Sequence, residues 1–138
     1  MIVIDTNVFV GACLGNGASA RLIAACLRGD HRVAMGAALL AEYEDVIGRT
    51  ALFESARLAE AERSELLDIF LSTCSWTRTY FLWRPNLRDE RDNHVLELAI
   101  AAGATHVVTW NLRDFKHGEL KFPSIAFCNP KQFLKEPL

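Results

Sequence analysis

Short apolar runs rich in β-branched residues alternate along the chain with longer segments in which apolar residues recur every three or four positions. The short runs predict buried strands, and the longer segments predict helices with one buried face. The expected strands lie at 2–4, 32–35, 76–82, 105–110 and 124–128. The expected helices lie at 19–28, 37–48, 54–74 (one bent helix or two), 91–103 and from residue 130 onward. This alternation indicates βαβ units, and therefore a three-layer α/β/α domain with a central parallel sheet of four to five strands.

The residues at the ends of these segments sharpen the prediction. Ser19 is suited to cap the helix at 19–28, and Gly29 is suited to end it. Gly48 and Gly103 play the same ending role for the helices that precede them, and Pro130 suits a first helical turn.

Length and composition narrow the class of protein. With 138 residues, the chain is expected to form a single domain over 1–138. Its charged fraction of 23% is typical of a globular protein. No basic leader precedes the first apolar run and no later run reaches the roughly 20 residues that span a bilayer, so we expect a cytoplasmic protein without membrane association. The four cysteines form no C-x-x-C pair, which favours reduced, mostly buried thiols.

Four acidic residues stand at positions that could carry chemistry. Asp5 and Asp114 each follow a predicted strand, where the open edge of a parallel sheet binds ligands. Asp92 opens the helix at 91–103, at the head of its buried stripe. Glu42 lies on the helix at 37–48, offset from its apolar face.

Each of these acids also has an ordinary structural interpretation. Asp5 and Asp114 could cap turns, and Asp92 could interact with the helix dipole. Glu42 could be a solvated side chain with Glu44 and Asp45 as equivalent neighbours. Asp89 competes with Asp92 for the same role.

Taken together, the four acids favour a metal site. Clustered carboxylates repel one another unless a cation compensates them or their pKa values rise strongly. Mg²⁺ or Mn²⁺ fits better than Zn²⁺, because no histidine or cysteine spacing accompanies the acids. Such a site activates water against a phosphodiester, so hydrolysis of nucleic acid is the expected reaction. The net charge of −2 means that local basic residues would have to hold the substrate.

Four segments of the chain resemble the PIN-domain family, and especially the VapC-like toxins of bacterial and archaeal toxin–antitoxin pairs. They are the opening MIVIDTNVFV, the helix LLAEYEDVI, the long segment RDERDNHVLELAIAAGATHVVTWNLRDF and the late NPKQFL. The resemblance covers essentially the whole chain, and it implies a PIN-like domain.

The resemblance also implies functional residues and partners. The catalytic and metal-binding acids would be Asp5, Glu42, Asp92 and Asp114, and the supporting residues would be Thr6, Asn7, Thr109, Asn111 and Asp89. It implies cleavage of single-stranded or looped RNA by one or two Mg²⁺ or Mn²⁺ ions, leaving a 5′-phosphate and a 3′-hydroxyl. It further implies a homodimer or higher oligomer and an antitoxin protein that obstructs the acidic pocket.

Residues that bind RNA are harder to predict from the sequence. Arg91, Arg113 and Lys116 are candidates for phosphate contacts, and Trp83 or Trp110 for base stacking. A long apolar stripe precedes residue 72 and consists of Phe53, Leu66, Leu67, Ile69, Phe70 and Leu71. We expect these residues to pack in the core, and the alternative is that they form a groove for a second subunit or an antitoxin.

Two other functions compete with the nuclease. A haloacid-dehalogenase-type phosphatase also places an aspartate after its first strand, but it needs a second aspartate two residues later, where Asn7 stands. A catalytically silent PIN-like module that only binds a partner is the other alternative.

Overall fold

The computed structural model describes residues 1–15, 17–54, 56, 58–78, 90–116 and 122–135, with only the backbone of residues 50 and 90–92. In chain order its elements, with η for 3-10 helices, are β1 (Ile2–Ile4), α1 (Thr6–Cys13), α2 (Gly17–Leu27), β2 (Ala34–Met35), α3 (Ala37–Ile47), η1 (Thr50–Phe53), α4 (Glu60–Thr73), β3 (Ser75–Trp76), α5 (Glu90–Ala102), β4 (His106–Val108), η2 (Leu112–Phe115), β5 (Ala126–Cys128) and α7 (Pro130–Leu134).

All strand pairings are parallel. One group has the order β1-β4-β5, and the other is the pair β2-β3. A single parallel bridge between Ile2 and Val33 joins the two groups, supported by a hydrogen bond of 2.8 Å from the Ile2 backbone N–H to the Arg32 carbonyl. The strands therefore follow the spatial order β3-β2-β1-β4-β5, and their carboxyl ends share one edge.

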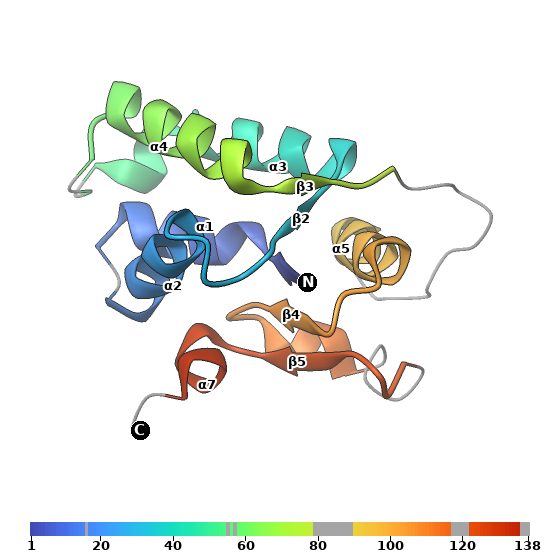
Figure 1. The fold of residues 1–138 in the computed structure, drawn as a ribbon. Coiled ribbons are helices and arrows are strands. Elements are labelled where there is room, and N and C mark those ends of the chain that lie inside the picture. The colour runs from blue at the N-terminus through green and yellow to red at the C-terminus, as the bar shows by residue number, and fades with distance from the viewer. Residues whose placement is uncertain (16, 55, 57, 79–89, 117–121, 136–138) are drawn as a thin grey trace.

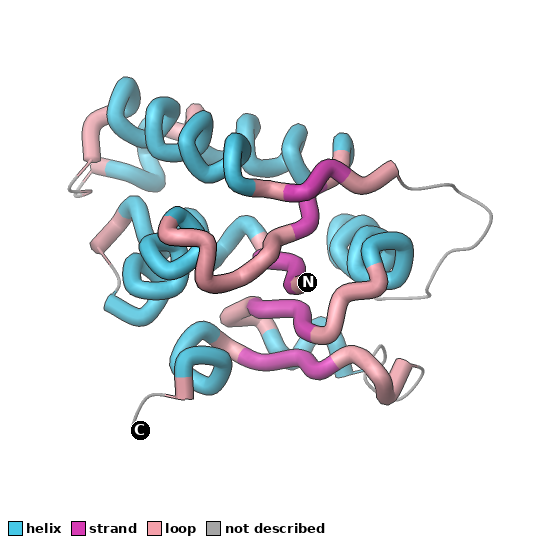
Figure 2. Tube along the Cα trace, in the orientation of Figure 1, coloured by secondary structure: helices cyan, strands magenta, loops and turns pink. Residues whose placement is uncertain are grey.

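Helices cover the strands on both sides. Figure 1 shows α1 and α2 on one side and α5 on the other, while α3 and α4 pack together alongside β2 and β3. Figure 2 shows how short the strands are relative to the helices. The predicted α/β class with a parallel sheet is confirmed, although the strands divide into groups of three and two.

The largest error of the sequence analysis concerns the segment after β1. We expected a loop followed by a helix at 19–28, but α1 begins directly at Thr6 and α2 begins at Gly17. Ser19 is therefore not a cap but a fully buried residue inside α2. The β-branched residues of α1 disfavour a helix locally, and burial of Val8 and Phe9 overrides that preference.

The other elements follow the prediction with shifted boundaries. The helix ends at Gly29 and Gly103 are confirmed, and both glycines adopt the left-handed conformation with φ of 85° and 65°. Of the strand expected at 76–82, only Trp76 belongs to a strand, β3, among the described residues. Positions 79–82 lie outside the described residues. The last helix begins at Pro130, with Asn129 as its cap.

Three aromatic side chains tie α1, α3 and α4 together. The ring of Phe9 lies 5.4 Å from that of Tyr43 and 5.7 Å from that of Phe70, and the rings of Tyr43 and Phe70 stack at 6.1 Å. All three side chains are fully buried. Aromatic pairs at such distances stabilise the core beyond their buried area.

Part of the predicted apolar stripe belongs to this core. Phe53, Leu67 and Phe70 are buried, whereas Ile69 points away from the core and is 46% exposed. The default of core packing is thus confirmed for the buried members. Among the described residues of α4, Ile69 is the large apolar side chain that remains exposed.

A buried arginine joins α4 to the end of α3. The Arg63 guanidinium donates hydrogen bonds of 3.3 Å to the Ile47 carbonyl and one of 3.1 Å to the Leu58 carbonyl. Its carbon lies 4.1 Å from the centre of the Phe53 ring. A cation at this position satisfies carbonyls at the C-terminus of α3 and interacts favourably with its dipole.

The cysteines are free thiols, as expected. Cys13 and Cys26 are buried, and Cys74 and Cys128 are partly buried. Burial raises the pKa of Cys26 and of Cys74 to about 12, so both remain protonated at neutral pH.

In the part of the chain that the structure describes, no single helix is long and apolar enough to cross a membrane. Only α1 and α2 together reach that length, but they are bent by 104° and both contribute side chains to the core.

The aromatic cluster generates a prediction about stability. Replacing Phe70 with Ala leaves a cavity between α1, α3 and α4 and should lower the free energy of unfolding by about 3–5 kcal/mol. The matched control is Ile69→Ala in the same helix, which should change it by less than about 0.5 kcal/mol because that side chain is largely exposed. Urea unfolding followed by circular dichroism measures both, and equal losses would contradict the assignment of Phe70 to the core.

Candidate active site

Asp5 lies where β1 ends and α1 begins. Its side chain caps α1 by accepting a hydrogen bond of 2.8 Å from the Thr6 backbone N–H to Oδ1. Its own backbone N–H donates to the Val108 carbonyl at 3.0 Å, which continues the pairing of β1 with β4. The residue is only 5% exposed. The carboxylate is thus held at the shared carboxyl edge of the strands, the position predicted from sequence.

The register of the two strands places Thr109 opposite Asp5. Ile4 pairs with Val108, so the residues that follow each strand occupy equivalent positions. The Thr109 hydroxyl donates a hydrogen bond of 2.9 Å to Oδ2 of Asp5. Thr109 is fully buried.

Asn7 links the same two side chains. Its Nδ2 donates to Oδ2 of Asp5 at 3.2 Å and to the Thr109 hydroxyl at 3.1 Å, while its Oδ1 accepts from the Trp110 backbone N–H at 3.0 Å. The Asn111 backbone N–H donates to the Thr109 hydroxyl at 3.0 Å. These bonds restrict the Asp5 carboxylate to one orientation.

Tyr43, on the buried face of α3, is part of this region. Its hydroxyl donates a hydrogen bond of 2.6 Å to the carbonyl of Ile4, the residue before Asp5. Burial raises the pKa of Tyr43 well above its usual value, and the negative charges of Asp5 and Glu42 add to that effect. The phenol therefore stays protonated and remains a donor.

Glu42 precedes Tyr43 on α3 and is partly buried. It lies one residue before the tyrosine whose hydroxyl bonds to the Ile4 carbonyl. Glu42 also differs from its neighbours Glu44 and Asp45 in exposure, because both neighbours are exposed to solvent. Periodicity alone left those three acids equivalent.

Asp114 lies one turn beyond the Thr109 loop. It belongs to η2, is partly buried, and its backbone N–H donates to the Asn111 carbonyl at 3.1 Å. A cavity of about 430 Å³ opens at this point, lined by residues 110–114. Arg113 lines the same cavity and is exposed, as is Lys116 directly after η2.

The third predicted acid is placed only through its backbone. Asp92 and Arg91 belong to the first turn of α5, but their side chains lie outside the described residues. Asp89 and Trp83 lie outside them altogether. Among the side chains that the structure describes, no three carboxylates, histidines or cysteines come together to hold a metal ion. The complete four-acid cluster therefore stays a prediction.

The oxygen atoms near Asp5 nevertheless suit a hard cation. The carboxylate oxygens of Asp5 and the hydroxyl oxygen of Thr109 are hard ligands of the kind that Mg²⁺ and Mn²⁺ prefer. The Thr6 hydroxyl oxygen is buried and has no hydrogen-bond partner among the described residues. An unsatisfied buried oxygen beside a carboxylate is compatible with a hydrated metal ion.

Trp110 is already engaged within the protein. Its indole N–H donates a hydrogen bond of 2.9 Å to the hydroxyl of Ser19 in α2, and the residue is partly buried. This contact holds the loop after β4 against α2. Base stacking on Trp110 stays a prediction.

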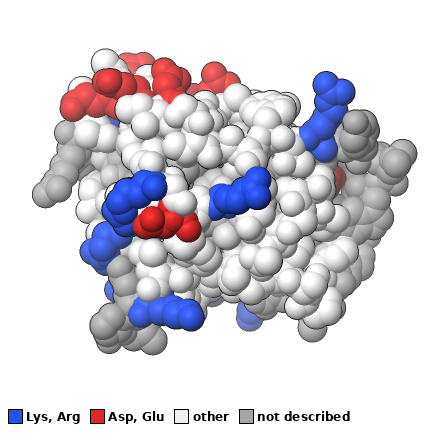
Figure 3. All heavy atoms as spheres, in the orientation of Figure 1, with Lys and Arg blue, Asp and Glu red and all other residues white. Residues whose placement is uncertain are grey.

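Surface charge distinguishes one face of the molecule. Four acidic side chains of α4 are exposed: Glu60, Glu62, Glu65 and Asp68. Figure 3 shows acidic side chains gathered along the top of the view, where Figure 1 places α4. This face repels a polyanion, so a nucleic acid would approach elsewhere.

Comparison with known proteins gives the family. The sequence pattern of the PIN domain matches residues 1–113. No protein in the curated collection matches the chain. One chain of the crystal structure of VapBC2 from Rickettsia felis, bound to a DNA fragment from their promoter, has a similar fold, with a TM-score of 0.57 and 19% sequence identity over 94% of this chain and 98% of that chain. The family match covers most of the sequence and begins with the β1–Asp5 segment, so the chain belongs to the PIN-domain family.

Proposed function

We propose that the protein is a metal-dependent endoribonuclease that acts as the toxin of a toxin–antitoxin pair. PIN domains are generally nucleases. The observation that carries the proposal is the buried Asp5 carboxylate at the carboxyl edge of β1, oriented by Asn7 and Thr109. The similarity in fold to a chain of VapBC2 supports the toxin role.

The proposal assigns roles to this chain's own residues. Asp5, Glu42, Asp92 and Asp114 would hold Mg²⁺ or Mn²⁺, with Asn111 and Asp89 nearby. Bound there, the ion would supply positive charge that activates water and stabilises the phosphodiester during in-line displacement. Thr109 and Asn7 orient the carboxylate of Asp5, and Thr6 fixes its other oxygen through a backbone hydrogen bond.

Substrate and partners belong to the same proposal. The substrate would be single-stranded or looped RNA, with phosphate contacts from Arg91, Arg113 and Lys116. A homodimer or higher oligomer and an antitoxin protein would complete the assembly. The phosphatase alternative is set aside because the family is PIN and because Asn7 serves as a hydrogen-bond donor to Asp5. A silent binding module remains the competing outcome of the experiments below.

Asp5→Asn tests the catalytic assignment. The amide can still cap α1, because its oxygen accepts the Thr6 N–H, but it lacks the charge that attracts a cation. We expect RNA cleavage to fall by about 100-fold or more while the circular dichroism spectrum of the folded protein is retained. The thermal midpoint should fall as well, because the amide nitrogen replaces an oxygen that accepts from Asn7 and Thr109. The assay uses a pool of structured and single-stranded RNAs with Mg²⁺, Mn²⁺ or chelator.

The matched control is Asp68→Asn on the exposed face of α4, which should cleave like the wild type. Asp92→Asn should match the Asp5 variant. Cleavage that persists in the Asp5 variant would remove Asp5 from the active site, and a wild-type protein that cuts nothing under any condition would favour the binding module.

Thr109→Val tests the positioning of Asp5. It removes the hydroxyl that donates to Oδ2 of Asp5 while keeping the branched shape. We expect the Mn²⁺ concentration for half-maximal cleavage to rise by about 10- to 100-fold, because outer hydrogen bonds orient metal ligands. Thr109→Ser should restore the wild-type value. A Val variant that is less stable but has unchanged metal dependence would show a purely structural role.

Expression in cells tests the toxin role. Induction of the wild-type chain in a bacterial host should arrest growth, and the Asp5→Asn variant should not. Co-expression of the protein encoded beside it should restore growth, if that neighbour is the antitoxin. Equal growth arrest by both forms would show that toxicity does not depend on the proposed site.

A further inference from the structure

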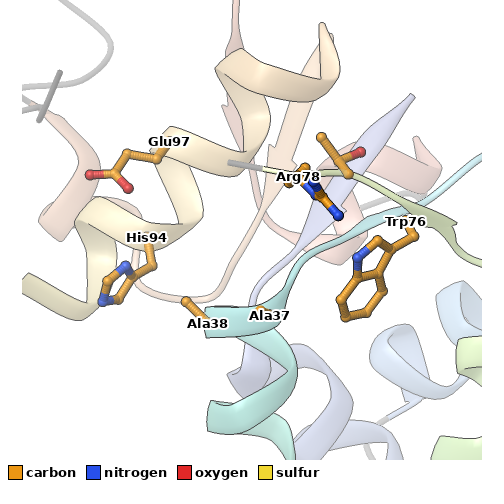
Figure 4. Close-up of a pocket in the computed structure, with 7 residues that line it drawn as sticks. Ala37, Ala38, Trp76, Arg78, His94 and Glu97 are labelled. Carbon is orange, nitrogen blue, oxygen red and sulfur yellow. The ribbon is translucent and has the colours of Figure 1, made fainter. Parts of the chain in front are cut away.

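A second cavity lies on the same edge of the sheet, away from the loop of Thr109. It has a volume of about 220 Å³ and is lined by the start of α3, the end of β3 and one face of α5: Ala37, Ala38, Trp76, Thr77, Arg78, His94 and Glu97. Figure 4 shows Trp76 and Arg78 on one side, His94 and Glu97 on the other, and Ala37 and Ala38 between them. The proposed function uses none of these residues.

The topology connects this cavity to Asp5. Strand β3 pairs with β2, and β2 is bridged to β1, so Trp76 ends a strand on the edge where Asp5 ends another. Adjacent strands are about 4.8 Å apart, which places β3 about 10 Å from β1. Ala38 in the cavity wall and Glu42 are one helical turn apart on α3 and share a face. The cavity therefore lies on the same edge as Asp5, about two strands away from it, and Glu42 is one helical turn from its wall.

The side of the cavity formed by β3 has the chemistry of a single-stranded nucleic-acid site. Trp76 is 60% exposed, the highest value among the large hydrophobic side chains that the structure describes as exposed. Exposure of the apolar face of an indole to water is energetically unfavourable, and a base stacked on the ring would cover that face. Arg78, two residues later, is also exposed and supplies positive charge.

The opposite wall suits the edge of a base rather than a phosphate. Glu97 is buried and carries a carboxylate, which repels phosphate. His94 beside it is partly buried and can donate or accept. Phosphate therefore belongs on the Arg78 side and the base edge on the α5 side.

We infer that this cavity binds one unpaired nucleotide of an RNA substrate next to the scissile phosphate, with its base stacked on Trp76 and a phosphate held by Arg78. The inference rests on the proposed function for the identity of the substrate. A base in a duplex is covered by its neighbours, so the cavity selects single-stranded or looped RNA over helical RNA.

The test measures binding separately from cleavage. A short fluorescein-labelled single-stranded RNA of mixed sequence is titrated with the full-length protein in chelator, and fluorescence anisotropy gives the dissociation constant. Trp76→Ala should weaken binding by about 5- to 100-fold, and Trp76→Phe should stay within about threefold of the wild type because it keeps a stacking face. Arg78→Ala should reduce the salt dependence of binding by about one counterion.

Controls match the exposure of each tested residue. Leu52→Ala removes another exposed apolar side chain, and Arg28→Ala removes an exposed arginine that pairs with Asp30. Neither should alter binding. A perfectly paired RNA hairpin of the same length should bind wild type and Trp76→Ala equally.

Three results would overturn the inference. The first is that Trp76→Ala binds the single-stranded RNA as tightly as the wild type. The second is that Trp76→Ala loses affinity for the hairpin as much as for the single strand. The third is an altered oligomeric state of Trp76→Ala in sedimentation with unchanged RNA affinity, which would make the cavity a subunit interface. Loss of cleavage in the Asp5→Asn variant tests the catalytic proposal independently, so the two ideas can fail separately.

Discussion

The hydrogen bond from Thr109 to Asp5 joins residues 104 positions apart, and the candidate site is organised around it. It exists because β1 and β4 pair in parallel, with Ile4 opposite Val108. A shift of this register by one residue would carry Thr109 to the other side of the sheet and leave the carboxylate without its donor. Asn7 and the backbone of residues 110 and 111 then close the network around the same two side chains.

The core sets the position of the helix that carries Glu42. Tyr43 follows it on α3, stacks on Phe70 and donates its hydroxyl to the Ile4 carbonyl. Arg63 holds the other end of α3 through the Ile47 carbonyl. An aromatic cluster and a buried cation thus hold α3, the helix that carries Glu42, against β1 and α4.

Acidic and basic side chains lie on different parts of the molecular surface. The outer face of α4 is acidic and repels nucleic acid, whereas Arg113 and Arg78 lie beside the two cavities along the carboxyl edge of the strands. A chain with a net charge of −2 can still carry positive charge locally in this way. Both cavities and Asp5 thus lie on one edge of the sheet.

Periodicity along the sequence determined the α/β class, the parallel strands and most helix ends, because alternating apolar runs and glycine stops are local signals. It also determined that Asp5 and Asp114 follow strands. It failed at α1, where burial of Val8 and Phe9 overrides a weak helix preference, and at Ser19, whose hydroxyl accepts from Trp110 instead of capping a helix. Only the tertiary structure decided that Thr109 meets Asp5, that Tyr43 reaches Ile4, that Glu42 is less exposed than its acidic neighbours, and that Trp76 and Arg78 line a cavity. These are contacts between distant segments, and they depend on strand register and helix packing, which no short stretch of sequence specifies.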